Sequence, residues 1–153
     1  MSEATPTTGS LVWRLSMKWR AAVDRAVAPL GLTHAQFVVL ASLYGLSRRG
    51  TRPSQRELAD FTGLEPVYVS RLAKALESSG MINRTDDPHD PRAVELTLTD
   101  HGIDIAVQAV AAVRELHDEL LAPIGGVDSA RNCELVATLQ ALLREHPQGE
   151  SSP

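Results

Sequence analysis

Apolar residues recur at helical spacing through the first third of the chain and predict two helices. Ser10 can cap the first helix, whose apolar stripe ends near residues 29–31. The second helix opens with a capping box of Thr33 and Gln36, in which each side chain satisfies a backbone N–H of the other residue. The apolar positions of the two helices are Leu11, Leu15, Trp19, Ala22, Val23, Ala26, Leu30, Phe37, Leu40, Ala41 and Tyr44.

Two shorter helices follow in the middle of the chain. Ser54 and Glu57 form a second capping box, and the helix that they open stops at residues 62–63. Pro66 suits the first turn of the next helix, which runs to about Ser78 and ends before Gly80. The apolar residues expected to pack these two helices together are Leu58, Phe61, Leu64, Val67, Leu72 and Leu76.

The periodicity then changes from helical to alternating. Residues 81–85 are typical of a short strand, and residues 86–91 have the Asp and Pro composition of a turn. In residues 94–98, Val94, Leu96 and Leu98 alternate with polar side chains, as in a half-buried strand. The two strands are predicted to form a hairpin with an extended tip.

The last third returns to helical periodicity. A long helix is predicted from Thr99 or Asp100, and residues 123–126 break it. Asp128 or Ser129 can cap a last helix. The inward candidates of the long helix are Ile103, Val107, Val110, Val113, His117 and Leu121. The predicted fold class is mainly α with a small β-hairpin.

Composition and charge narrow the class of protein. The 153 residues are 43% apolar and 22% charged, which favours a soluble globular protein. The net charge of −4 is uneven: residues 1–47 carry +2, residues 48–92 carry +1, and residues 93–153 carry −7. A basic face in the middle of the chain therefore remains compatible with nucleic-acid binding. No apolar run reaches the roughly 18 residues of a membrane helix, and no secretory signal opens the chain, so a cytoplasmic location is expected.

The two short helices and the hairpin together predict a winged helix-turn-helix. The second helix of such a unit fits the major groove, about 12 Å wide, and its first turns present side chains to base edges. Any pair of antiparallel helices can imitate the motif, but the hairpin that follows favours the DNA-binding interpretation. Tyr68, Ser70, Arg71 and Lys74 lie on the face that the helix would offer.

Residues 31–102 resemble the winged-helix core of the MarR family of bacterial transcriptional regulators. The matching motifs are G-L-T-x-x-Q-F-x-x-L at residues 31–40, Q-x-E-L-A at residues 55–59 and V-S-R-L-x-x-x-L-E-x-x-G at residues 69–80. The wing signature of the family, D-x-R followed by L-T-x-x-G, occurs at residues 90–92 and 98–102. The flanking helices also fit, so the resemblance covers roughly residues 10–146.

The resemblance implies a homodimer held by the first helix and the last two. It places a winged-helix lobe at about residues 33–99 in a single domain of residues 10–146, with dimerisation helices at about 10–30 and 100–146. Residues 1–9 and 147–153 are expected to be disordered. Apolar residues on several faces of the terminal helices, such as Ile105 and Ala106 beside Ile103 and Val107, favour a partner independently.

The residues expected to contact DNA fall into three groups. The recognition helix offers Pro66, Val67, Tyr68, Ser70, Arg71 and Lys74. The basic loop and the next helix start offer phosphate contacts through Arg48, Arg49, Arg52, Ser54 and Gln55. The wing offers Arg84, His89, Asp90 and Arg92, and the Asp90 carboxylate is expected to hold the Arg92 guanidinium outward. For the recognition helix and the basic loop, plain solvated surface is the competing interpretation, and for Asp90 and Arg92 of the wing it is a surface ion pair.

Other chemistries are less favoured by the pattern. Asp86, Asp87, His89 and Asp90 are metal-ligating types, but their tight spacing favours a turn, so no metal and no cofactor is expected. The single cysteine, Cys133, lies in an apolar helical stretch and is expected to be buried rather than to sense redox state. No nucleophile motif, phosphate loop or zinc-protease motif occurs, so the chain is not expected to be an enzyme.

The resemblance further implies a small aromatic or phenolic effector between the dimer helices and the winged lobe. The candidate pocket residues are Trp13, Met17, Trp19, Arg20, His34, Phe37 and Val38, although both tryptophans can equally be core or dimer interface. The function expected is a sequence-specific repressor that binds a pseudo-palindromic operator as a homodimer. The alternative is a winged-helix module that binds small molecules or proteins and not DNA.

Overall fold

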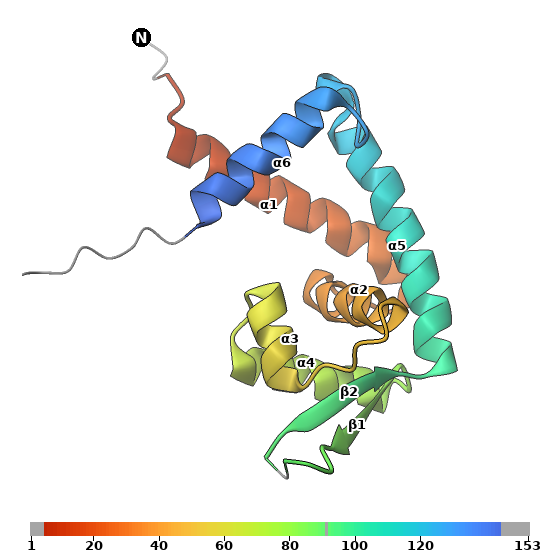
Figure 1. Cartoon of the computed structure of the whole chain (residues 1–153). Coiled ribbons are helices and arrows are strands. Elements are labelled where there is room, and N and C mark those ends of the chain that lie inside the picture. Colours follow the sequence, from red (N-terminus) through yellow and green to blue (C-terminus); the bar gives the residue numbers. More distant parts are fainter. Residues whose placement is uncertain (1–4, 91, 145–153) are drawn as a thin grey trace, which may run out of the picture. The chain divides into compact units, whose positions relative to one another are not determined.

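The computed structural model describes residues 5–90 and 92–144 and divides the chain into two compact units, which meet in sequence between Val113 and Arg114. Six α-helices and one antiparallel hairpin make up the described residues, which confirms the predicted fold class (Figure 1). The proposed single domain over residues 10–146 stays a prediction. The predicted disordered tail, residues 147–153, lies outside the described residues.

The first unit opens with helix α1 (Thr8–Val27), the short 3-10 helix η1 (Ala28–Leu30) and helix α2 (His34–Arg48). The cap of α1 is Thr7 rather than Ser10: the Thr7 hydroxyl accepts from the backbone N–H of Ser10. The helix therefore starts three residues before the predicted position and includes the end of the segment expected to be disordered. The predicted capping box of Thr33 and Gln36 is present.

Only the second half of α1 is buried within the first unit. Ala22, Val23 and Val27 face the core with α2, whose buried residues are Val39, Leu40 and Leu43. The first half of α1 instead exposes a run of large apolar side chains: Leu11, Val12, Trp13, Leu15 and Met17. A surface of this size is unusual for a protein that acts alone.

Helices α3 (Gln55–Thr62) and α4 (Pro66–Ser78) form the helix-turn-helix. The capping box of Ser54 and Glu57 opens α3, and Gly63 ends it with a φ of 73°, a left-handed conformation that a side chain would disfavour. The buried face of α4 consists of Val69, Leu72, Ala73 and Leu76, at the spacing of one helical stripe.

Two residues predicted to pack α3 against α4 lie elsewhere. Phe61 is 60% exposed and Val67 is 74% exposed. The inner face of α3 is formed by Leu58 and Ala59, and the inner face of α4 begins at Val69. The helical spacing from these residues places Phe61 and Val67 off the buried faces. Leu58, Leu72 and Leu76 are buried as predicted.

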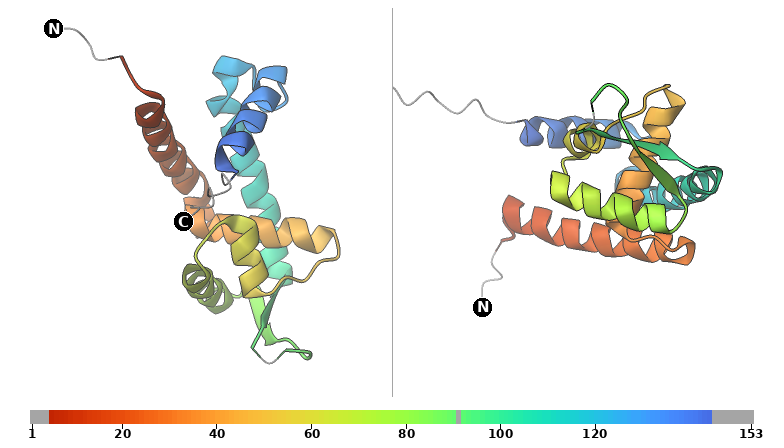
Figure 2. Two further views of the ribbon diagram at one scale, coloured as in Figure 1. Left: turned by 60° about the vertical axis from the view of Figure 1, so that its left-hand side comes forward. Right: turned by 90° about the horizontal axis from the view of Figure 1, so that it is seen from below.

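Strands β1 (Ile82–Asp86) and β2 (Val94–Leu98) pair antiparallel, with Ile82 opposite Leu98 and Asp86 opposite Val94. The first strand begins one residue later than predicted. Strand β2 also bonds to the segment before α3: the Leu96 backbone N–H donates to the Pro53 carbonyl at 2.9 Å. The hairpin tip extends away from α2, α3 and α4 (Figures 1 and 2).

Helix α5 (Asp100–Leu120) follows β2 after the single residue Thr99. The Thr99 hydroxyl accepts from the Gly102 backbone N–H at 3.0 Å and donates to the Gly80 carbonyl at 2.6 Å. A Cβ on Gly102 would collide with the Met81 carbonyl oxygen. The L-T-x-x-G motif is thus a helix cap followed by a position where only glycine fits.

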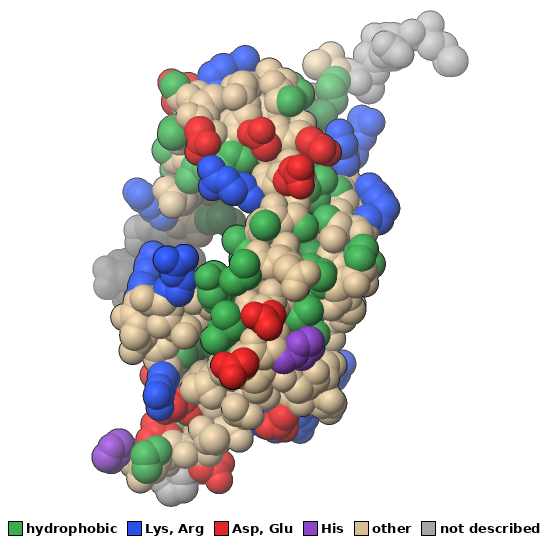
Figure 3. All heavy atoms as spheres, turned by 90° about the vertical axis from the view of Figure 1, so that its right-hand side faces the viewer, with side chains coloured by type: hydrophobic (Ala, Val, Ile, Leu, Met, Phe, Trp, Pro, Cys, Tyr) green, Lys and Arg blue, Asp and Glu red, His purple; other side chains and the backbone are tan. Residues whose placement is uncertain are grey.

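The buried side of α5 in the first unit differs from the prediction. Small residues form it, namely Gly102, Ala106 and Ala109, and Val113 continues it. Ile103, Val107 and Val110 are exposed, and hydrophobic side chains reach the surface along this helix (Figure 3). The inward candidates were wrong at these three positions because close packing selects small side chains over the most apolar ones.

The second unit contains the end of α5, the 3-10 helix η2 (Ala122–Ile124) and helix α6 (Ala130–Leu143). Ser129 caps α6, as predicted, and Asp118 accepts from the Val127 backbone N–H at 3.0 Å. No described residue of α6 is buried, and Val136, Leu139, Leu142 and Leu143 are exposed. Cys133 is exposed too, which contradicts the predicted burial: within its unit it lies on an outer face of α6, whereas Asn132 and Leu135 of the same helix are half-buried.

The described residues contain no single helix that is long and apolar enough to cross a membrane. One bent pair, Thr8–Leu30 with His34–Arg48, meets the length and composition criteria when the two are taken together.

Candidate nucleic-acid interface

The outer face of α4 carries the residues predicted to read DNA. Because the opposite face is buried, Pro66, Val67, Tyr68, Arg71 and Lys74 are all exposed, and Ser70 is half-buried. The exposed fraction of Val67 is 74%, which is high for an apolar side chain at the start of a helix. Glu65 precedes the first turn without a side-chain capping bond. The structure therefore gathers the predicted recognition residues on one surface.

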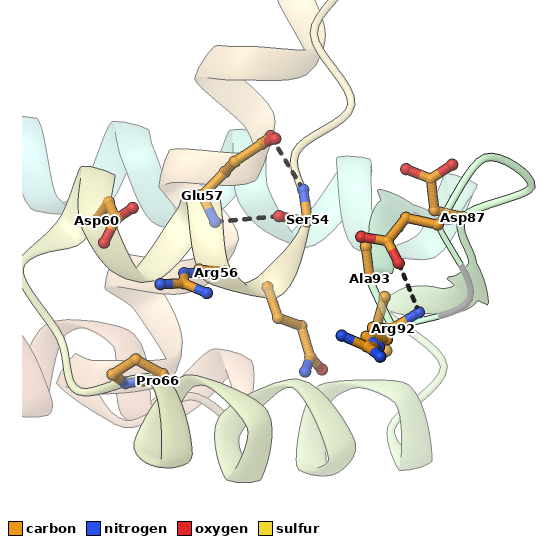
Figure 4. A pocket seen from close by; sticks show the side chains of 11 residues that line it. Ser54, Arg56, Glu57, Asp60, Pro66, Asp87, Arg92 and Ala93 are labelled. Carbon is orange, nitrogen blue, oxygen red and sulfur yellow. Dashed lines mark hydrogen bonds between the residues drawn. The ribbon is translucent and has the colours of Figure 1, made fainter.

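The start of α3 is occupied by its own capping box. The Ser54 hydroxyl accepts from the Glu57 N–H at 3.1 Å, and the Glu57 carboxylate accepts from the Ser54 N–H at 3.2 Å (Figure 4). Two of the backbone donors expected to hold a phosphate are thus used within the chain. The Ser54 hydroxyl proton remains available as a donor.

The basic loop before α3 makes contacts with its own chain. Arg48 stacks on the Tyr44 ring, with the guanidinium carbon 5.8 Å from the ring centroid. Arg52 lies 3.8 Å from Glu95 on β2, yet 76% of its side chain is exposed. Arg49 is exposed as well. The exposed guanidinium of Arg52 can still reach a phosphate.

The hairpin tip is built by two side chain to backbone hydrogen bonds. Asp87 Oδ1 accepts from the His89 N–H at 2.8 Å, and Asp90 Oδ1 accepts from the Arg92 N–H at 3.0 Å. The predicted bond from Asp90 to the Arg92 guanidinium is wrong in this detail, because a spacing of two residues favours an Asx turn with the backbone. Asp90 therefore orients Arg92 through its backbone, and the exposed guanidinium is left outside the turn.

A groove of about 850 Å³ separates the start of α3 from the hairpin. Arg56 of α3 and Arg92 of the hairpin both line it (Figure 4). The other lining residues are Ser54, Gln55, Glu57, Asp60, Pro66, Asp87, Asp90, Ala93 and Val94. Four carboxylates thus accompany two guanidinium groups, so shape and directed hydrogen bonds have to contribute to any phosphate contact here.

Arg56 and Asp60 line this groove, and neither was predicted as a site residue. They lie four residues apart in α3, and both are exposed, so their helical spacing puts them on one face. The buried residues Leu58 and Ala59 fix which face of α3 is inward, and the helical spacing from them could have identified Arg56 and Asp60 as outward.

Arg84 differs from the other predicted wing residues because it points into the protein. Its Nε donates to Gln55 Oε1 at 3.1 Å, and its Nη1 lies 3.7 Å from Glu77 Oε1. Only 20% of the side chain is exposed. Gln55 and Arg84, predicted as separate DNA contacts, therefore bond to each other.

The predicted effector residues lie along α1 and the first turns of α2. The His34 backbone N–H donates to Asp24 Oδ1 at 2.7 Å, and burial lowers the pKa of the His34 imidazole against the opposing effect of Asp24. Phe37 and Val38 are half-buried, Arg20 is exposed, and Trp13 is 66% exposed. Trp13 and Met17 precede Asp24 by about 16 and 10 Å along the helix, so one chain does not gather all these residues around His34.

The acidic residues of the hairpin belong to the turn at its tip. In residues 5–90 and 92–144, no group of three or more His, Cys, Asp or Glu side chains is arranged to hold an ion. Asp87 and Asp90 instead accept backbone hydrogen bonds of the turn.

The exposed α4, the capped α3 and the hairpin define a winged helix-turn-helix protein. The profile of the MarR family matches residues 32–94. The HTH-type transcriptional regulator YdcH of Bacillus subtilis is 33% identical over 114 residues, which cover 74% of this chain and 78% of YdcH. The chain belongs to the MarR family of transcriptional regulators, and neither the family nor the relative is described as an enzyme.

Solved structures agree with the fold. A mutant MarR of Escherichia coli in complex with operator DNA has a TM-score of 0.75 and 28% identity, and the match covers 89% of this chain and 93% of that one. A MepR–DNA complex of Staphylococcus aureus has a TM-score of 0.79 at 23% identity and covers 91% and 97% of the two chains, which supports the fold alone.

Proposed function

We propose that this protein is a sequence-specific DNA-binding repressor that acts in the cytoplasm as a homodimer on a pseudo-palindromic operator. In this proposal α4 enters the major groove and Arg92 of the hairpin reaches the neighbouring minor groove. Binding of the dimer would block access to a promoter, and a small aromatic ligand would relieve it.

The observation that carries the proposal is the outer face of α4. Val67, at 74% exposure, stands beside Arg71 and Lys74 on a helix whose other face is buried. An apolar side chain suits a thymine methyl group, while an arginine can donate two hydrogen bonds to guanine O6 and N7. A module that binds only small molecules at another site would leave Val67 in water. The operator complex of the MarR relative supports this assignment.

The homodimer is supported by apolar surface on two separate elements. The first half of α1 exposes Leu11, Leu15 and Met17, and α6 exposes Leu142 and Leu143. A second copy of the chain would remove these side chains from water. The dimer would also present two α4 helices to half-sites about one turn of DNA apart, which is why a pseudo-palindrome is proposed.

The aromatic effector is supported by the exposed ring of Trp13 on α1 and by the half-buried ring of Phe37 on α2. Aromatic side chains stack on aromatic ligands, and Arg20 could pair with a carboxylate or phenolate. If the dimer interface completes the pocket, a panel of phenols and aromatic acids should release bound DNA.

The decisive experiment recovers fragmented bacterial genomic DNA on the purified protein and sequences it. The proposal expects enrichment of a few sites with inverted half-sites. The variant Lys74→Ala serves as a control and should recover the same sites in lower yield. Recovery of unenriched DNA would restrict the protein to non-specific binding, and absence of any recovered duplex at low salt would favour the alternative, a winged-helix module for small molecules or proteins.

A further inference from the structure

Arg84, in the middle of β1, bonds to both helices of the helix-turn-helix. Gln55 is the first residue of α3, and Glu77 lies in the last turn of α4. Besides the two guanidinium contacts, the Arg84 backbone N–H donates to Glu77 Oε2 at 3.2 Å. Arg84 is only 20% exposed, whereas the paired Arg52 is 76% exposed. The Arg84 side chain therefore contacts the protein and not the surface that a duplex would cover.

The chemistry of the guanidinium also fixes the orientation of Gln55. A guanidinium only donates hydrogen bonds, so the Gln55 atom that faces Arg84 has to be the carbonyl oxygen. The amide nitrogen of Gln55, with its two donors, consequently faces away from Arg84. Gln55 lines the groove between α3 and the hairpin, where Arg56 and Arg92 also lie.

A second attachment holds the other strand of the hairpin. The Leu96 N–H bonds to the Pro53 carbonyl, and Ser54 forms a β-bridge with Glu95. This attachment fixes β2 against the start of α3 but does not reach α4. Of the contacts described for the hairpin side chains, the pair of Arg84 with Glu77 is the one that extends to α4.

We propose that Arg84 is a positioning residue for DNA recognition: it holds the hairpin at a fixed angle to α4 and directs the Gln55 amide nitrogen toward a phosphate. This inference rests on the proposed function and adds a residue that acts without touching DNA. The planar guanidinium holds several donors in fixed directions, so Arg84 can contact Gln55 and Glu77 at the same time. A lysine ammonium cannot keep both contacts. A misplacement of the hairpin would weaken minor-groove contact while leaving α4 free to bind.

The test compares two duplexes, one selected by the wild-type protein from a randomised library and one scrambled duplex of equal composition. Arg84→Met should weaken the selected duplex about tenfold or more and the scrambled duplex less than about threefold. The slope of log affinity against log salt should stay unchanged, since no phosphate contact of a charged group is lost. Arg84→Lys should not restore affinity. Arg25→Met, at an exposed arginine in the last turn of α1, is the control with the same change in charge.

Gln55 provides a second route to the same test. Gln55→Glu keeps an acceptor for Arg84 but removes the amide donors, so it should weaken both duplexes alike. The losses of Arg84→Met and Gln55→Met should be less than additive in the double variant, because one acts through the other. If Arg84→Met does not fold, Gln55→Met removes the same hydrogen bond from its other end and should weaken the selected duplex more than the scrambled one.

Four results would overturn the inference. A salt slope reduced by about one per subunit in Arg84→Met would make Arg84 a direct phosphate contact. Equal losses on both duplexes with a melting temperature below that of the control would make it only structural. Unchanged affinity in Arg84→Met, with normal binding by the wild type, would refute the positioning role alone, whereas a wild type that binds no duplex would refute the proposed function as well.

Discussion

Arg71 and Lys74 lie one turn apart on the exposed face of α4, yet they are expected to contribute differently to binding. A guanidinium can make two directed hydrogen bonds to guanine, while an ammonium is a compact charge that suits a phosphate. Arg71 is therefore expected to determine base specificity, and Lys74 is expected to contribute affinity for any duplex.

Arg71→Ala should reduce the free energy of operator binding by about 1–3 kcal/mol per half-site and relax base preference at one position. Lys74→Ala should weaken all duplexes similarly and reduce the salt slope by about one per subunit. Fluorescence anisotropy over a salt series measures both quantities. Equal weakening of specific and random duplexes by Arg71→Ala would show that Arg71 contacts only phosphate.

His34 predicts a pH dependence of stability. Burial lowers the pKa of its imidazole below 6.5, so the unfolded chain binds a proton at a pH where the folded chain does not. The stability contributed by neutral His34 is thus fully present above pH 6.5. It is lost as the pH falls through the pKa that His34 has in the folded protein. His34→Gln should flatten the fall in unfolding midpoint between about pH 8 and pH 5. An identical pH profile in wild type and His34→Gln would contradict the assignment.

At the scale of elements, the hairpin and the start of α5 have separate roles. Two Asx turns shape the hairpin tip, which carries Arg92 outward. The other end of the hairpin joins α5 through Thr99, and Gly102 packs against the Met81 backbone. Changes at the tip should therefore alter DNA binding, and changes at the base should alter folding.

Arg92→Ala should leave the melting temperature nearly unchanged but lower operator affinity and weaken the preference for A·T pairs beside the core site. The reason is that a narrow minor groove attracts an exposed guanidinium, while the turn itself needs only the Arg92 backbone N–H. Asp90→Ala should give a smaller loss of affinity. Unchanged affinity in Arg92→Ala, measured at physiological salt, would leave recognition to α4 alone.

Gly102→Ala should destabilise the fold strongly, by about 2 kcal/mol or more, because the new methyl group would collide with the Met81 carbonyl. Backbone carbonyls cannot rotate away as a flexible side chain can. Urea unfolding followed by circular dichroism measures the effect, with Gly45→Ala in α2, where nothing lies within 4 Å of the new Cβ, as the control. Equal midpoints for the two variants would refute this account of the glycine.

The elements were predictable from the sequence because their signals are local. Capping boxes at Thr33 and Ser54, proline at the first turn of α4 and alternation in residues 94–98 each act within a few residues. The contacts of Arg84 were not predictable, since Gln55 lies 29 positions away and any of several acceptors was compatible with the spacing. Val67 and Phe61 were misplaced because hydrophobicity alone does not distinguish a buried position from an exposed one.

At the scale of the whole molecule, exposed apolar surface is the feature that requires an explanation. It is found on the first half of α1, on α5 and on α6, far apart in the sequence. The net charge is also distributed unevenly along the chain: residues 93–153 carry −7, while the rest of the chain is mildly basic. An assembly that covers the apolar helices while leaving the winged lobes free would account for the apolar surface.

The protein should therefore be a dimer at micromolar concentration. Leu15→Glu and Leu139→Glu, each at an exposed apolar position, should shift it toward monomer by placing a charge where a partner would bury it. Light scattering combined with size-exclusion chromatography gives the mass, and Val67→Glu is the control, because it changes an even more exposed apolar residue on α4. A wild type that remains a stable 16.5 kDa species would overturn the proposed architecture.

Thr99 is the single residue between β2 and α5, and this short connection constrains how the chain can change in length. One residue inserted or deleted at Thr99 would rotate every later side chain of α5 by about 100° and move Gly102 away from Met81. At the hairpin tip, Asp87 and Asp90 close local turns, so a change of length there does not rotate a helix. The fold should accordingly tolerate insertions between β1 and β2, natural or engineered, although they would alter DNA binding, and it should not tolerate them at Thr99.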